Sequence, residues 1–301
     1  MVHNKSVIIG YIYAIAAAAF FGSVTTLSKP VLSDVSPILL SSLVYLVAGA
    51  TFTPLAQRNE ETKSGKKYYL LVVLTAIVGA SVGPIMFFSG LKLTAASDVA
   101  ILSNGETVFS ILFAILFFKE KLNRFGYLAV TIVLIGLFIV TTNLTFDKNT
   151  LTFNTGDLLI IFATVAWALD NNISKIIARH IHVSRLVQLK SLIGGGLTLL
   201  IVLIMRTPFN IQYVQIIPIV YVGLFGVALS LYLYLHSIKR IGVVRGSSIL
   251  SLSAIFGLIF AVVFLKETIS VYQVVAVLVM LLGIFLLYRT QPEKRTDNSE
   301  K

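Results

Sequence analysis

Cysteine is absent from this chain of 301 residues, and charged residues make up only 12% of it. Without cysteine, a disulfide framework, a thiol nucleophile and a zinc or iron–sulfur site built on thiolates are excluded. The scarcity of charge is matched by a hydrophobic content of 57%, above the roughly 45–50% of ordinary soluble domains. Water is therefore not the main solvent of this protein, and membrane-spanning segments are expected.

Ten mostly apolar stretches occupy most of the sequence. A helix needs about 20 such residues to cross a hydrocarbon layer of roughly 30 Å. The sequence therefore predicts an all-α integral membrane protein. Its ten transmembrane helices are expected near residues 7–27, 36–55, 68–90, 95–118, 125–142, 156–178, 184–205, 214–236, 244–265 and 271–288. The charged segment 289–301 is expected to be a disordered cytoplasmic tail.

The distribution of positive charge predicts the orientation of the chain. Of 24 Lys and Arg residues, 18 fall at the two ends and in the loops after the second, fourth, sixth and eighth predicted helices, whereas 5 fall in the alternate loops. The positive-inside rule then makes both termini cytoplasmic. The net charge of +11 marks topology, so no nucleic-acid partner is expected. The expected partners are the lipid bilayer of the plasma membrane and a small-molecule substrate, and a homodimer is left open.

The chain also contains an internal repeat. Residues 89–140 align without a gap onto 236–287 at a shift of 147, and the first helix of each half aligns at a shift of 146. The aligned pairs include Phe21 with Trp167, Phe117 with Phe264, Lys119 with Lys266, and Glu120 with Glu267. Each copy holds five helices, over 7–142 and 156–288, and an odd number of spans inserts the second copy upside down. Inverted repeats are a recurrent design of secondary transporters, because two related halves can alternate around one midplane site.

The repeat unit resembles the EamA-type domain of the drug/metabolite transporter superfamily, in particular its ten-helix members. In the first helix of each copy an aromatic residue precedes a lysine, as in Phe21 to Lys29 and Trp167 to Lys175. Each fourth helix ends in an acidic motif, which is Phe117 to Glu120 in the first copy and Phe264 to Glu267 in the second. The proline that often follows a Glu or Thr in the fourth helix is absent from both copies, so no forced break is expected there. The resemblance implies a carrier of metabolites such as amino acids, often directed outward. It also implies a central cavity lined mainly by helices one, three, four, six, eight and nine.

Few charges fall near the centre of a predicted span, where each costs at least about 2.5 kcal/mol and usually faces a cavity or a partner. Glu106 lies at the middle of the fourth helix, where its carboxyl group can take up and release a proton; the alternative is a Glu that braces a helix contact. Asp170 and Lys190 lie equally far from the turn near His180, so they are expected to share a depth and to pair. Whether this pair supports the fold or binds substrate is left open.

Other polar and aromatic residues are candidates for substrate binding or gating. Asn171 and Asn172 carry amides that can form hydrogen bonds with a carboxylate or an amine of a substrate, although such groups also form hydrogen bonds between helices. Trp167 falls at mid-depth, where its ring can stack on a substrate. The candidate gate residues are Tyr232, His236, Asp98 and Arg245, for which an aromatic belt or helix-end anchoring is the alternative.

An intramembrane enzyme and a channel are the competing classes of function. An enzyme needs a nucleophile, a base or a ligand cluster at one depth, and the four histidines all lie near membrane edges. No catalytic residue, metal or cofactor is therefore expected. Phosphorylated substrates are disfavoured because Lys190 is the basic residue that clearly lies within the membrane. The prediction is an alternating-access exporter of amino acids or related metabolites, with proton coupling at Glu106; an uncoupled facilitator or channel-like permease is the alternative.

Overall fold

In the computed structural model, residues 2–57, 65–118, 123–142 and 154–290 are described. The predicted tail from residue 291 onward and the first copy of the acidic motif, Lys119 and Glu120, lie outside these ranges. Within them every regular element is helical. The first half contains α1 (Val2–Val31), α2 (Pro37–Gln57), α3 (Lys66–Ile77), η1 (Val78–Val82), α4 (Gly83–Leu93), α5 (Ala96–Leu102), α6 (Gly105–Phe118) and α7 (Arg124–Thr142). The second half contains α8 (Thr155–Ile177), α9 (Val183–Ile204), α10 (Tyr213–Tyr221), η2 (Val222–Leu229), α11 (Ser230–Ile241), α12 (Val243–Leu250), α13 (Ser253–Leu265) and α14 (Val271–Thr290).

The predicted all-α membrane fold is confirmed. Seven of the described helical segments are long and apolar enough to cross a membrane, and α7 and α14 supply shorter apolar helices. The fourth predicted span is divided between α5 and α6. The third and eighth spans are continuous, but each contains a π-helical turn, η1 or η2, between two α-helical parts. These ten apolar segments correspond to the ten predicted helices.

Both the fourth and the ninth spans are broken, although neither contains the proline that would force a break. The interruptions fall at Ser103 and Asn104 and, in the second half, at Ser251 and Leu252. Ser103 Oγ donates to the carbonyl of Val99 at 2.7 Å, and Ser251 Oγ donates to that of Ser247 at 3.0 Å. A serine that bonds the carbonyl four residues earlier competes with the backbone ladder and bends the helix. Each break therefore coincides with a serine that makes such a bond.

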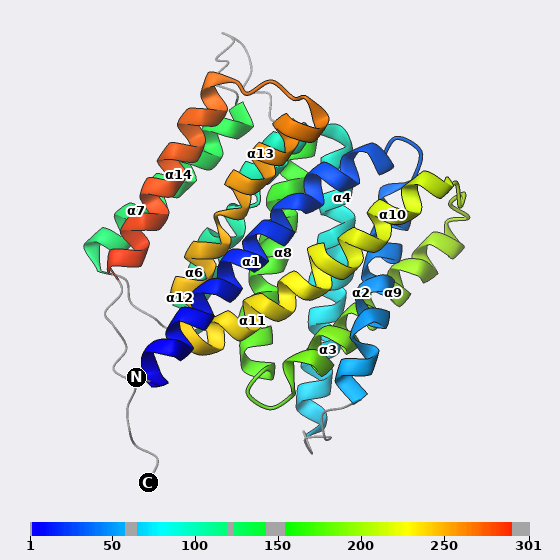
Figure 1. The fold of residues 1–301 in the computed structure, drawn as a ribbon, viewed down its shortest axis with the longest axis horizontal. Coiled ribbons are helices and arrows are strands. Elements are labelled where there is room, and N and C mark those ends of the chain that lie inside the picture. The colour runs from blue at the N-terminus through cyan, green and yellow to red at the C-terminus, as the bar shows by residue number, and fades with distance from the viewer. Residues whose placement is uncertain (1, 58–64, 119–122, 143–153, 291–301) are drawn as a thin grey trace.

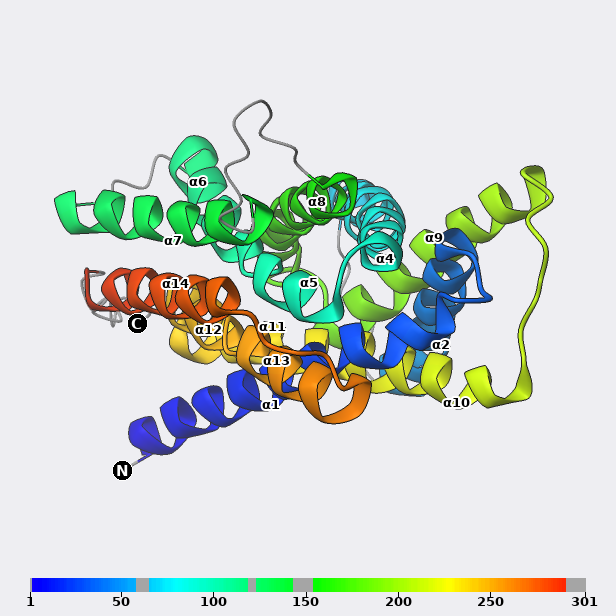
Figure 2. The ribbon, with the colours of Figure 1, turned by 90° about the horizontal axis from the view of Figure 1, so that it is seen from above.

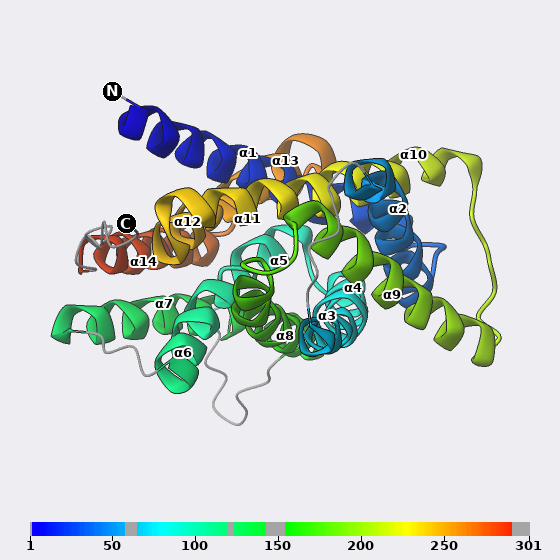
Figure 3. The ribbon, with the colours of Figure 1, turned by 90° about the horizontal axis from the view of Figure 1, so that it is seen from below.

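The helices form two layers that exchange elements between the repeats (Figures 2 and 3). One layer contains α1 with α11 to α14, and the other contains α8 with α3 to α7. The first helix of each repeat therefore packs against the later helices of the other repeat. The layers are joined by α2 along α9 at one edge and by α7 along α14 at the opposite edge (Figure 1).

Small residues let the central helices approach closely. A Cβ atom added to Gly22 of α1 would lie 2.7 Å from the carbonyl oxygen of Ser253 and 3.0 Å from the nitrogen of Gly257 on α13. A Cβ atom added to Gly90 of α4 would lie 2.6 Å from the carbonyl oxygen of Gly156 on α8. In a membrane, such close backbone packing holds helices together where the hydrophobic effect between them is weak.

The two ends of the bundle differ in how tightly they are packed. The start of α1 and the end of α14 lie at one end, called here the termini end, and the turns after α1 and α13 lie at the opposite, far end (Figure 1). At the far end α5 packs closely against α13. Their counterparts in the repeat, α12 and α6, touch only sparsely at the termini end. The bundle is thus closed at its far end.

Candidate functional site

A cavity of about 80 Å³ lies between the two layers. Residues that the repeat makes equivalent line it together: Phe21 with Trp167, Val24 with Asp170, and Gly79 with Gly226. The rings of Phe21 and Trp167 meet edge to face, with centroids 5.8 Å apart. The cavity therefore lies where the two repeats face each other. The predicted lining by helices one, three, four, six, eight and nine is confirmed, and Tyr45 and Lys190 add helices two and seven.

The π-helical turn η1 shapes one wall of the cavity. The carbonyl oxygen of Gly79 accepts hydrogen bonds from Trp167 Nε1 at 3.0 Å and from Tyr45 Oη at 3.3 Å. A π-turn disturbs the regular helical ladder, and such turns are frequent at functional sites. A Cβ atom at Gly79 would overlap the carboxyl group of Asp170, so only glycine lets α8 approach here. The bulge thereby sets the positions of both Trp167 and Asp170.

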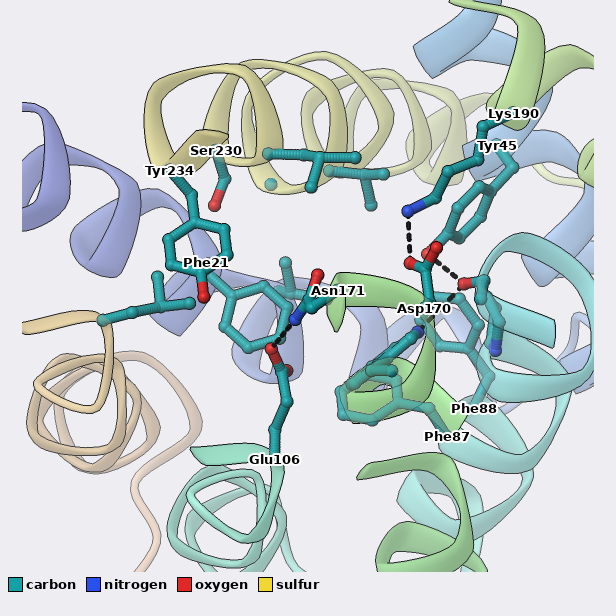
Figure 4. A pocket seen from close by; sticks show the side chains of 18 residues that line it. Phe21, Tyr45, Phe87, Phe88, Glu106, Asp170, Asn171, Lys190, Ser230 and Tyr234 are labelled. Atoms are coloured by element: carbon teal, nitrogen blue, oxygen red, sulfur yellow. Dashed lines mark hydrogen bonds and ion pairs between the residues drawn. The ribbon is translucent and has the colours of Figure 1, made fainter. Parts of the chain in front are cut away.

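Asp170 and Lys190 form the ion pair that was predicted from the hairpin between the sixth and seventh spans (Figure 4). Each residue is only 2% exposed. Asp170 Oδ1 also accepts a hydrogen bond of 3.1 Å from Ser174 Oγ. The two opposite charges neutralise each other inside the bundle, as buried charges must.

Glu106 is held differently, in the first turn of α6 directly after the break in the fourth span. Its Oε1 accepts a hydrogen bond from Asn171 Nδ2, and the ring of Phe21 lies beside this contact (Figure 4). The first turn of a helix exposes unpaired N–H groups that favour a negative charge. The sole basic residue among the described lining residues is Lys190, which is paired with Asp170. The carboxyl group of Glu106 therefore has a neutral partner.

Several predicted site residues lie outside the cavity lining. Asn172 donates to the carbonyls of Ser110 at 3.1 Å and Ala168 at 2.9 Å, so it joins α8 to α6. The rings of Tyr232 and His236 lie against each other at an angle of 39°, with centroids 4.2 Å apart, further along α11. Arg245 lies on α12 at the sparsely packed end. The roles suggested for these residues in binding or gating remain predictions.

The far end is closed by charged side chains that cap helix ends. Lys29 Nζ donates to the carbonyls of Leu91 at 2.7 Å and Thr94 at 2.6 Å, at the C-terminus of α4. The carboxylate of Glu267 accepts from the backbone N–H groups of Ala96 at 2.9 Å and Ser97 at 3.0 Å, at the N-terminus of α5. Both contacts match charge to the helix dipole. Lys29, the lysine of the first repeat, therefore joins α1 to α4. Glu267, from the acidic motif of the second repeat, joins the end of α13 to α5.

Asp98, a candidate gate residue, belongs to the same far end. Its Oδ1 accepts a hydrogen bond of 2.8 Å from Gln273 Nε2, which also donates to Ser97 Oγ at 2.9 Å. Because Gln273 lies on α14 and Asp98 on α5, this contact joins the two halves. Its position fits helix-end anchoring, and a role in gating remains a prediction.

The residues that the sequence reasoning missed lie mainly on the third span. Gly79 and Phe87 both line the cavity, and the Phe87 ring lies 5.0 Å from that of Trp167 between centroids. The signal that could have found them is the repeat itself, since Gly79 and Gly226 are also separated by 147 residues. Extending the alignment to the third span marks that segment as part of the cavity.

Comparison with known proteins gives consistent matches along the whole chain. The model of the EamA-like transporter family matches residues 8–142 and again residues 154–289. An uncharacterized transporter of Methanothermobacter thermautotrophicus is 30% identical over 93% of this chain and 86% of its own length. A WAT1-related chloroplastic protein of Arabidopsis thaliana is 23% identical over 89% of this chain and 66% of its own length. A solved crystal structure superposes with a TM-score of 0.67 at 19% identity, covering 94% of this chain and 96% of that one, which shows a shared fold.

Proposed function

Because the chain belongs to the EamA-like transporter family and is a membrane transporter of the drug/metabolite type, we propose that it exports amino acids or related small metabolites by alternating access. The membrane is proposed to be the plasma membrane, with both termini in the cytoplasm. The observation that carries this proposal is the cavity between the repeats, which holds a carboxyl group that pairs with no cation among the described residues.

Alternating access is supported by the unequal packing of the two ends. The far end is closed by α5 against α13, with Glu267 and Lys29 capping the neighbouring helix ends. The repeat makes α12 and α6 equivalent to α5 and α13, so the same packing can form at the termini end. Exchange between the two arrangements would open the cavity to each side in turn. In the proposed orientation, the present arrangement is closed toward the outside.

Proton coupling is assigned to Glu106. A carboxyl group in a cavity that opens alternately to two solutions can bind a proton on one side and release it on the other. Asp170 is unsuited to this task because its protonation would break the ion pair with Lys190. The coupling residue is therefore the carboxyl group whose protonation breaks no ion pair.

The test is transport by the purified protein in lipid vesicles. Labelled amino acids are screened with and without an imposed pH gradient, for the native chain, Glu106→Gln and Asp34→Asn. The last variant makes a matched carboxyl-to-amide change at an exposed turn outside the cavity. Transport that follows the gradient in the native chain and in Asp34→Asn, but not in Glu106→Gln, supports the proposal. Transport that ignores both the gradient and the Glu106 change indicates an uncoupled facilitator.

A further inference from the structure

The charges of the cavity do not balance. Its described lining contains two carboxyl groups, on Glu106 and Asp170, and one basic group, on Lys190. Lys190 is paired with Asp170, which is also bonded to Ser174. Asn171 gives Glu106 a hydrogen bond but no charge. An ionised Glu106 therefore leaves the described lining with one negative charge in excess.

The walls around this carboxyl group are largely aromatic. Phe21, Trp167, Phe87 and Tyr234 line the cavity, and Figure 4 shows Phe21 and Tyr234 on the same side as Glu106. Aromatic faces attract cations, by about 0.5–1 kcal/mol when exposed and about 2 or more when desolvated. A carboxylate beside several such faces favours a positively charged group with an apolar body.

Most hydrogen-bond donors of the described wall side chains already have partners, and the spare N–H groups of Asn171 and Lys190 lie beside the carboxyl groups of Glu106 and Asp170. Tyr45 Oη and Trp167 Nε1 both donate to the carbonyl of Gly79, and Ser230 Oγ donates to the carbonyl of Ala17 at 3.0 Å. Tyr234 Oη shares a hydrogen bond of 2.7 Å with Ser247 Oγ. A bound carboxylate or phosphate needs several donors. These groups can serve one only after giving up their present partners.

From these three observations we infer that the cavity recognises an organic amine or ammonium cation, with its positive group at Glu106 and its apolar body against Phe21 and Trp167. This inference rests on the proposed carrier function and narrows its substrate class. The ammonium group of a zwitterionic amino acid can occupy the same position, but its carboxylate finds the spare N–H donors of Asn171 and Lys190 only beside the carboxyl groups of Glu106 and Asp170. Among molecules that share one carbon skeleton, the amine is expected to bind most tightly, the amino acid less tightly and the carboxylic acid most weakly.

Binding can be measured without transport, because Trp167 is the one tryptophan of the chain and lines the cavity. Its fluorescence in detergent-purified protein is titrated with phenethylamine, phenylalanine and 3-phenylpropionate, which share a phenyl ring and differ in charge. The expected result is a saturable response to phenethylamine, a response to phenylalanine at ten or more times the concentration, and none to 3-phenylpropionate. In Glu106→Gln the affinity for the amine falls at least tenfold, whereas Asp34→Asn leaves it unchanged.

A second variant tests the inference independently in case Glu106→Gln fails to fold. Phe21→Leu keeps the carboxyl group and the apolar volume but removes one aromatic face, so amine affinity should fall about three- to tenfold. The inference is overturned if the native chain shows no saturable response to the amine, or binds the acid as tightly. Amine binding that survives Glu106→Gln in a folded protein overturns it as well. Because no gradient is used, failure of vesicle transport with amine binding intact counts against the carrier proposal alone.

Discussion

Asp170 and Glu106 present two carboxyl groups to one cavity, but the protein holds them in opposite ways. Asp170 is paired with Lys190 and bonded to Ser174, whereas Glu106 is bonded to the neutral amide of Asn171. A charge that is balanced within the fold belongs to the framework of the site, because any ligand must first break the pair. A charge that is left without a cation is available to a proton or a substrate. Under the proposed function, Asp170 is therefore the supporting carboxylate and Glu106 the functional one.

Breaking the framework pair should have the largest effect on stability. Lys190→Met leaves the carboxylate of Asp170 buried without a counterion, which typically costs about 3–5 kcal/mol. The expected result is a clearly lower midpoint of thermal unfolding in detergent. The double variant Asp170→Leu with Lys190→Met should recover most of this loss, because no unpaired charge remains. A single variant as stable as the native chain, or a double variant no better than the single, would contradict the assignment.

A third carboxylate adds to the comparison, because the hydrogen bonds that Glu267 accepts come from backbone N–H groups at the start of α5. Glu267→Gln weakens this cap, with an expected loss of about 1 kcal/mol in the closure of the far end. The chain has no cysteine, so Ser97→Cys, at a position only 2% exposed, supplies a single reporter thiol. Its labelling by a maleimide should rise several-fold when Glu267→Gln is added. Equal labelling with and without that change would show that Glu267 does not hold the far end closed.

Glu106→Gln should have the smallest effect on stability. The amide oxygen of Gln can still accept the hydrogen bond of Asn171, and no charge is left unpaired, so a change of less than about 1 kcal/mol is expected. The same thermal unfolding measurement should therefore place Glu106→Gln near the native chain and far from Lys190→Met. If Glu106→Gln proves as damaging as Lys190→Met, Glu106 braces a helix contact and is not the functional carboxyl group.

Side-chain direction shows where sequence reasoning reached its limit within the site. Asn171 and Asn172 are adjacent and chemically identical, yet Asn171 bonds Glu106 in the cavity while Asn172 bonds Ser110 between helices. One residue along a helix turns the side chain by about 100°, since there are 3.6 residues per turn. Choosing between them requires knowing which face of α8 meets the cavity, and that depends on helices distant in the chain.

Local and periodic features were available without a structure. The length of the apolar stretches indicated ten spans, the shift of about 147 residues revealed the repeat, and the short hairpin placed Asp170 opposite Lys190. All three depend on spacing along the chain, which sequence reports directly.

Contacts between distant segments were decided by the tertiary structure. The carbonyl of Gly79 that orients Trp167 and the capping of α5 by Glu267 both arise where one helix meets another. In a bundle of apolar helices, most faces are equally able to pack, so composition does not select partners. Close fit of backbones and satisfaction of each buried polar group make that selection.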